Sequence, residues 1–238
     1  MLGFLLSART ILTLSAIIPA IMLLLHVLRK DRLDKESPLF ILSLVGWGIL
    51  STFAAMILEK IGSFILAFFF PYRTLIYNAI FYYVVVAMSE EGSKYYLLRR
   101  RTWNSSEFNC QYDAVVYAVA VSMGFALWEN LMYVFSYGLS TALLRALTAV
   151  PGHASFGVMM GVWYGMERRY AYWGNEMRKK FSSVMAFVLP VLMHGTYDFL
   201  CSISYGWKGN LVFIAFIIIL FSLSWNMVDR ASRKDQYL

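Results

Sequence analysis

Long apolar runs separated by short basic loops constrain this chain more than any other feature of its sequence. Several of these runs reach or exceed the ~20 residues that a helix needs to cross a bilayer. Between them lie short charged segments such as RKDRLDKE at 29–36 and RRR at 99–101. Only 15% of the residues are charged, against about 25% in average soluble proteins. The sequence therefore predicts a multi-pass membrane protein built of transmembrane helices.

We predict an all-α, polytopic transmembrane bundle with about seven spans. The spans cover approximately residues 8–28, 38–58, 73–98, 113–137, 141–166, 181–203 and 210–228. The apolar segment 61–70 is too short to cross a bilayer alone. We expect it to be re-entrant, interfacial, or the start of a kinked third helix that Pro71 breaks. The chain shows no internal repeat and no soluble domain, so residues 1–238 are expected to form one membrane-embedded domain.

The distribution of basic residues predicts the orientation of the chain. Fifteen Lys and Arg residues fall in four segments on one side of the alternating topology, and five fall on the other side. Cytoplasmic loops carry the excess of Lys and Arg, so we expect the N-terminus outside and the C-terminus in the cytoplasm. The net charge of +7 comes from these loops and not from a basic tail or an aromatic-interleaved patch. We therefore expect membrane lipid, and no nucleic acid, as a partner.

Seven ionisable side chains fall inside four of the predicted spans, where such groups are rare and usually mark function. They are Glu90, Glu91, Lys94, Glu129, His153, His194 and Asp198. At ~1.5 Å rise per residue, the four helices place their ionisable groups roughly 15–24 Å from their cytoplasmic edges. With ordinary helix tilts these groups can occupy one layer of the membrane. The sequence therefore predicts a shared polar cavity.

Helical spacing also predicts which of these residues share a face. His194 and Asp198 are four residues apart, as are Glu90 and Lys94, so each pair lies on one face of its helix. His153 heads an i+4 series of glycines at 157, 161 and 165. A stripe of small residues lets a neighbouring helix pack closely, so His153 is expected to face the bundle and not lipid.

Each of these groups also has a purely structural interpretation. The carboxylates and Lys94 can form an intramembrane salt bridge, His194 and Asp198 can be a packing contact, and Arg145 can snorkel to the interface. Taken together, a structural role has to account for more carboxylates than Lys94 can neutralise and for two histidines in the same layer. The combination therefore favours function over packing.

Carboxylates combined with imidazoles are suited to activating water. A buried Glu can serve as a general base, and polar donors can stabilise the oxyanion of a tetrahedral intermediate. Alternatively, Glu and His side chains supply the oxygen and nitrogen ligands that zinc accepts, and metal-bound water attacks a carbonyl. Both schemes lead to hydrolysis of a peptide bond inside the membrane.

Four short motifs carry a resemblance to a known family. EEGSK fits EExxK, FALWEN fits FxxxEN, HASFG fits HxxxG and HGTYD fits HxxxD, in this order on successive predicted helices. The set resembles the PrsW family of intramembrane proteases, which is distantly similar to the CAAX-processing and bacteriocin-immunity membrane proteases. The resemblance covers about residues 75–200, the motif-bearing core.

The resemblance implies cleavage of a single-pass membrane protein, such as an anti-sigma factor, in a prokaryotic cell membrane. It implies that Glu90 and Glu91 form the essential acidic pair with Lys94 as charge partner. It further implies that Glu129 is a second acid and that His194 with Asp198 completes the catalytic site. The CAAX-processing relatives carry His at the position of Glu129 and Asn at that of Asp198, so their mechanism does not transfer directly. His153 is the candidate replacement for that histidine.

The metal content stays open at the level of sequence. One zinc ion is the expected cofactor if a metal is present, with Glu129, His153 and His194 as candidate ligands. Two other function classes also fit the residues. A proton- or cation-coupled transporter could use the same charges as a relay, although the inverted halves typical of many transporters are not visible. A non-catalytic membrane scaffold could use them only to hold helices together.

Overall fold

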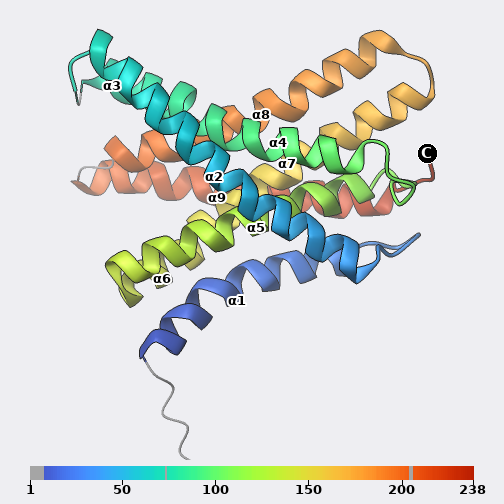
Figure 1. Cartoon of the computed structure of the whole chain (residues 1–238), viewed down its shortest axis with the longest axis horizontal. Helices are drawn as coiled ribbons and strands as arrows, with labels where there is room; N and C mark the ends of the chain where they lie inside the picture. The colour runs from blue at the N-terminus through green and yellow to red at the C-terminus, as the bar shows by residue number, and fades with distance from the viewer. Residues whose placement is uncertain (1–7, 73, 204–205) are drawn as a thin grey trace, which may run out of the picture.

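The computed structural model describes residues 8–72, 74–203 and 206–238, and this part of the chain is helical apart from short loops (Figure 1). The elements in chain order are α1 (Ala8–Arg29), α2 (Pro38–Phe69), α3 (Leu75–Ile80), the π-helix η1 (Phe81–Ala87), α4 (Met88–Thr102), α5 (Asp113–Tyr137), α6 (Leu139–Leu147), α7 (Ala149–Tyr172), α8 (Glu176–Ile203) and α9 (Gly206–Arg233). The all-helical prediction is confirmed for these residues.

Among the described residues, five helices are long and apolar enough to cross a membrane: α1, α2, α5, α8 and α9. Two further long stretches, 75–102 and α7, carry much of the ionisable site. Charged and polar side chains lower the hydropathy of these two stretches, which is why composition alone does not single them out. The chain is a multi-pass integral membrane protein.

Helix α5 is the central element of the bundle. Within its most apolar 18-residue window, 72% of the residues are buried, against 17–33% in the other four candidate spans. It packs against α1, α2, α4 and α7. The polar residues near its C-terminal end are therefore held inside the bundle.

The predicted close packing of the α7 glycine stripe is confirmed. A Cβ atom at Gly161 would lie 2.5 Å from the Val115 Cα atom of α5, and one at Gly157 would lie 2.7 Å from the Ser122 hydroxyl. Only glycine allows the two backbones to approach this closely. His153, one turn before the stripe, is 4% exposed, as the sequence predicted.

Two predicted boundaries are wrong. Residues 61–70 are not a re-entrant segment, because α2 continues through this segment to Phe69. No turn residue interrupts it, and the Ser63 hydroxyl donates to the Glu59 carbonyl within the helix. The predicted helix over 141–166 is divided in two, because Thr148 leaves the helical conformation (φ −124°, ψ −67°) between α6 and α7. The first difference concerns the segment that follows Glu59, and the second concerns the segment that contains Arg145; both residues line the cavity described below.

Figure 1 also shows where the basic loops lie. The α1–α2, α4–α5 and α7–α8 connections and the C-terminus all lie at the right-hand end of the bundle, whereas α3 and α6 lie at the opposite end. The four basic segments of the sequence therefore share one end of the structure.

Candidate active site

A cavity of about 410 Å³ opens into the bundle between α2, η1, α4, α5, α6, α7 and α8. Its ionisable lining residues are Glu59, Glu90, Glu129, Arg145, His153, His194 and Asp198, and aromatic rings such as Phe125, Phe156 and Tyr197 complete the wall. Five of the residues predicted for the site from sequence therefore line one cavity. Glu91 and Lys94 lie directly behind this wall, in contact with it.

The π-helix η1 directly precedes α4, whose first turn contains Glu90 and Glu91. It is fixed against α8 where Gly195 faces Tyr83, since a Cβ atom at Gly195 would lie 2.5 Å from the Tyr83 ring. The Tyr83 hydroxyl also pairs with the Thr196 hydroxyl at 2.8 Å. These contacts flank His194, so the same packing that seats η1 sets the position of the α8 imidazole relative to α4.

Lys94 is the centre of the buried charge cluster. Its ammonium nitrogen lies 2.7 Å from Glu91 Oε1, 3.3 Å from Glu90 Oε2 and 3.2 Å from His153 Nδ1. The side chain is fully buried and lies over the ring of Phe125 at 3.9 Å. An ammonium group has three donors and no acceptor, so these three contacts account for all of its hydrogens.

His194 links the acidic pair to α8. Its Nδ1 atom lies 2.8 Å from Glu91 Oε1, and its Nε2 atom lies 3.3 Å from Asp198 Oδ2 and 3.9 Å from Glu90 Oε2. Its ring stacks on Phe156 at a centroid distance of 4.8 Å. The imidazole is therefore held on its edges by carboxylates and on its face by an aromatic ring.

Glu129 and His153 form the second half of the cluster. Glu129 Oε2 lies 2.8 Å from His153 Nε2, and the other ring nitrogen of His153 faces Lys94. Because an ammonium cannot accept a hydrogen bond, His153 Nδ1 acts as the acceptor. The ring hydrogen is then on Nε2, where it is donated to Glu129.

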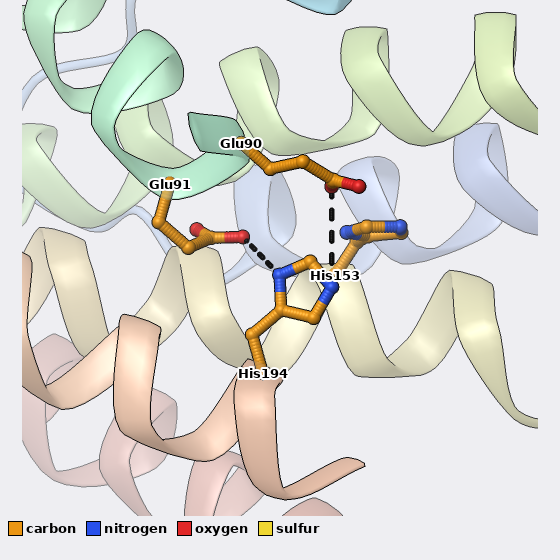
Figure 2. A group of neighbouring side chains, drawn as sticks. All are labelled: Glu90, Glu91, His153 and His194. Atoms are coloured by element: carbon orange, nitrogen blue, oxygen red, sulfur yellow. Dashed lines mark hydrogen bonds and ion pairs between the residues drawn. The ribbon is translucent and has the colours of Figure 1, made fainter. Parts of the chain in front are cut away.

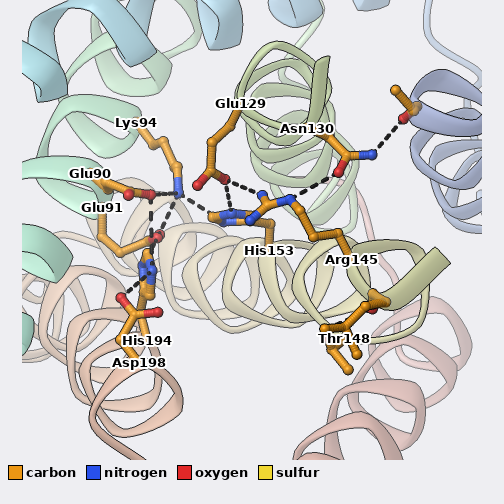
Figure 3. Close-up of polar contacts among 12 residues, drawn as sticks. Glu90, Glu91, Lys94, Glu129, Asn130, Arg145, Thr148, His153, His194 and Asp198 are labelled. Carbon is orange, nitrogen blue, oxygen red and sulfur yellow. Dashed lines mark hydrogen bonds and ion pairs between the residues drawn. The ribbon is translucent and has the colours of Figure 1, made fainter. Parts of the chain in front are cut away.

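Figure 3 shows that these contacts form one continuous chain of polar groups. The order is Asp198, His194, Glu91, Lys94, His153, Glu129, Arg145 and Asn130. All seven ionisable residues predicted from sequence belong to this network, with Glu90 joined through Lys94. The structure thus brings together side chains from α4, α5, α7 and α8.

The donor set of the cluster suits a metal ion. Glu90, Glu91, His153 and His194 each offer one ligand atom, and these atoms lie within 4.8 Å of one another (Figure 2). All four residues are buried, and carboxylate oxygens with imidazole nitrogens are ligands that zinc accepts. Of the ligands predicted from sequence, His153 and His194 belong to this group. The Glu129 carboxylate instead pairs with Arg145 and His153, and its metal role stays a prediction.

Sequence reasoning missed two charged residues on the cavity wall. Glu59 lies one residue beyond the predicted second span, and α2 presents it on the same face as Thr52 and Met56. Arg145 was interpreted as a snorkelling side chain, which is wrong, because its guanidinium lies 2.8 Å from Glu129 inside the bundle. The apolar run 61–70 is the signal from which the continuation of the second helix past Glu59 could have been predicted.

Comparisons with known proteins identify the family of the chain. The sequence model described as "PrsW family intramembrane metalloprotease" matches residues 36–224. The chain is 29% identical over 225 residues to Protease PrsW of Clostridioides difficile, covering 92% of this chain and 90% of the relative. It is 30% identical over 224 residues to Protease PrsW of Halalkalibacterium halodurans, covering 93% and 97%.

A third relative, Protease PrsW of Bacillus subtilis, is 29% identical over 201 residues, covering 81% of this chain and 84% of the relative. No solved structure matches the chain significantly. The family match includes every residue of the buried charge cluster described above. The chain belongs to the PrsW family of intramembrane metalloproteases.

Proposed function

We propose that this membrane protease hydrolyses a peptide bond of a single-pass membrane protein, such as an anti-sigma factor, within the cavity described above. The observation that carries the proposal is the buried Glu and His cluster at the wall of this cavity. A cavity between membrane helices can admit an unwound stretch of a substrate helix while excluding most water. The carboxylate and imidazole groups are of the kind that hydrolysis requires.

Within this proposal the two adjacent carboxylates have different tasks. Glu90 lines the cavity, whereas Glu91 is not among the described residues that line it. Glu91 makes the shorter contact to Lys94 and also holds His194. We therefore assign Glu90 as the general base, with Glu91 as the residue that fixes the neighbouring cation and imidazole.

The proton balance of the reaction follows from this assignment. Water attacks the carbonyl carbon of the scissile peptide bond while Glu90 accepts its proton. The C–N bond then breaks as the same proton passes to the leaving amine nitrogen. Lys94, behind the carboxylate pair, holds the Glu90 carboxylate in place for this step.

A zinc ion is the metal that we propose for the site. Glu91, His153 and His194 would hold it, and Glu90, the fourth buried residue of the group whose ligand atoms gather there, would stay free as the base. When bound, zinc supplies a Lewis acid for the carbonyl oxygen and lowers the pKa of a bound water. The alternative ligand from sequence, Glu129, can be distinguished by substitution.

The activity can be tested with purified protein in proteoliposomes and a pool of single-pass transmembrane peptides, with products identified by mass spectrometry. Glu90→Gln and His194→Ala are expected to abolish cleavage. Glu176→Gln, at an exposed glutamate at the start of α8, is the matched control and should cleave normally. Full cleavage by both site variants would show that the cluster is not the catalytic site.

The metal can be tested by elemental analysis of the same preparations. One zinc per chain is expected in the unmodified protein, with loss of zinc in His153→Ala and His194→Ala. Glu129→Gln should retain the zinc if Glu91, His153 and His194 are the ligands. Loss of zinc from Glu129→Gln with retention in Glu91→Gln would instead favour the ligand set expected from sequence.

We also propose that α1, α2, the continuous 75–102 segment, α5, α7, α8 and α9 all cross the membrane as one domain, with the N-terminus outside. The gathering of the basic loops and the C-terminus at one end of the bundle supports this topology. An impermeant thiol reagent tests it on single-cysteine variants of intact cells. A cysteine in the α7–α8 loop should react only after the membrane is permeabilised.

A further inference from the structure

Arg145 lies on α6, a nine-residue helix between the two membrane helices that carry Glu129 and His153. Its side chain is 13% exposed and lines the catalytic cavity. Its Nη2 atom donates to Glu129 Oε2 at 2.8 Å, and its Nε atom donates to Asn130 Oδ1 at 2.9 Å. The face of the guanidinium lies 4.0 Å from the ring centroid of Tyr133. These contacts fix the planar group on two edges and one face.

Asn130 anchors this arrangement to a further helix. It is fully buried, and its Nδ2 atom donates to the Ala16 carbonyl of α1 at 2.9 Å. The amide oxygen must therefore face Arg145, since the amide nitrogen is the group that can donate to a carbonyl. The position of the Arg145 guanidinium is thus set by α1 and α5 together, and not by α6 alone.

The contact to Glu129 has a consequence for His153. Glu129 Oε2 accepts from both Arg145 Nη2 and His153 Nε2. A carboxylate fixed by a guanidinium keeps its oxygen at the place where it receives the imidazole hydrogen. This favours the His153 tautomer with hydrogen on Nε2, and it leaves the lone pair of Nδ1 directed at the Lys94, Glu90 and Glu91 group.

We propose that Arg145 is a positioning residue that acts through Glu129 to hold His153 in the tautomer that the Lys94 contact also favours. This inference rests on the proposed function only for its effect on turnover, because the tautomer itself is a property of the resting protein. The same arrangement occurs at metal centres, where the second nitrogen of a ligating imidazole donates to a carboxylate that fixes its tautomer. In this chain Arg145 in turn orients the Glu129 carboxylate.

Arginine suits this role better than lysine. Its planar fork donates to two acceptors at once and stacks on an aromatic ring, whereas an ammonium is a point charge. Arg145→Lys can keep the charge next to Glu129 but cannot reproduce the paired contacts to Glu129 and Asn130. We therefore expect Arg145→Lys to behave between the unmodified protein and Arg145→Gln.

The tautomer can be measured by nitrogen NMR of the full chain labelled with 15N-histidine in detergent. The chain contains three histidines, so the ring signals can be assigned by single substitution. The unmodified protein should show His153 with hydrogen on Nε2 alone. Because Lys94 also faces Nδ1 and favours the same tautomer, the comparison is made in a Lys94→Met background. There Arg145→Gln should give a mixture of tautomers, and Arg145→Lys a smaller admixture. Arg178→Gln, the same change at an α8 arginine outside the cavity, is the control and should leave the signals unchanged.

Cleavage of the transmembrane peptide pool provides the second readout. Arg145→Gln should lower kcat by about 10–100-fold, the usual effect of losing a residue that orients a ligand or catalytic group, with KM unchanged. In a Glu129→Gln background the additional Arg145→Gln change should have no further effect on kcat, because the two residues act in series. Arg145→Lys should recover part of the loss.

Two results would overturn the proposal. One is an unchanged His153 tautomer in both Arg145 variants of the Lys94→Met background, which would mean that Arg145 acts on the substrate or only on packing. The other is an equal loss of kcat from Arg145→Gln with and without the Glu129→Gln change. Absence of cleavage by the unmodified protein would refute the proposed substrate class instead, and the NMR result would still decide the role of Arg145.

Discussion

Replacing Lys94 with Met removes an ammonium group from contact with two buried carboxylates. The Lys94 nitrogen lies 2.7 Å from Glu91 and 3.3 Å from Glu90, and the side chains of Lys94 and Glu91 are fully buried. Removing one partner of a buried ion pair costs about 3–5 kcal/mol, because the other charge stays buried without compensation. Met is an unbranched side chain of similar length, so the change in packing is small. At about 2–4 °C per kcal/mol for a chain of this size, the melting temperature should fall by about 6–20 °C.

The matched control is another lysine paired with a glutamate three residues earlier. Lys179 contacts Glu176 at 3.1 Å, but the side chains are 28% and 64% exposed. Exposed pairs contribute about 0–1 kcal/mol, so Lys179→Met should melt close to the unmodified protein. The two substitutions share chemistry and sequence spacing and differ in burial, so their difference isolates the effect of burial.

The assay is thermal unfolding of purified protein in detergent with a chelator present, which prevents a bound metal from replacing the lost charge. Adding Glu91→Gln to Lys94→Met should recover much of the stability, because the uncompensated charge is then removed as well. The reasoning is refuted if Lys94→Met melts within about 1 °C of the unmodified protein, or if Glu91→Gln adds to the loss.

Further predictions concern packing and pH. Gly124→Ala should destabilise the fold by about 1–3 kcal/mol, because its Cβ atom would lie 2.1 Å from the Val45 carbonyl oxygen of α2. Gly46→Ala, inside α2 with open space around the new Cβ atom, should instead stabilise the fold by up to about 1 kcal/mol in the same melting assay. Burial raises the pKa of Asp31 to about 6 and that of Glu36 to about 7, both in the α1–α2 loop. The folded chain therefore holds these protons more tightly than the unfolded chain, and stability should fall as pH rises from about 4 to about 7. Asp31→Asn should flatten part of this fall in a pH series of melting temperatures, and a steeper fall would contradict the assignment.

Two of the contacts in the site could be predicted from the spacing of residues along single helices. His194 and Asp198 are four residues apart in the sequence, and their side chains meet at 3.3 Å. Glu90 and Lys94 have the same spacing and meet at 3.3 Å. These contacts follow from the geometry of one helix, so no tertiary information is needed to predict them. The depth argument then placed the four helices' charged groups in one layer.

The parts that could not be predicted depend on how helices end and pack. Glu59 faces the cavity because α2 extends well past the usual length of a span, and Arg145 enters the bundle because the chain breaks at Thr148. The two adjacent glutamates also could not be distinguished, since which of them faces the cavity depends on the helix geometry that precedes them. Sequence periodicity assumes a regular α-helix, and η1 does not have that geometry.

The π-helix over Phe81–Ala87 makes this part of the chain sensitive to its number of residues. Hydrogen bonds in a π-helix join residues five apart instead of four, so such a segment accommodates an extra residue relative to an α-helix. Deleting one residue from it would rotate the preceding turns by about 100° relative to Glu90. Phe81 and Tyr82, which line the cavity with Glu90, would then face elsewhere. Substitutions within this stretch can preserve the site where an insertion or deletion cannot, so we expect relatives to vary here in residue type more than in length.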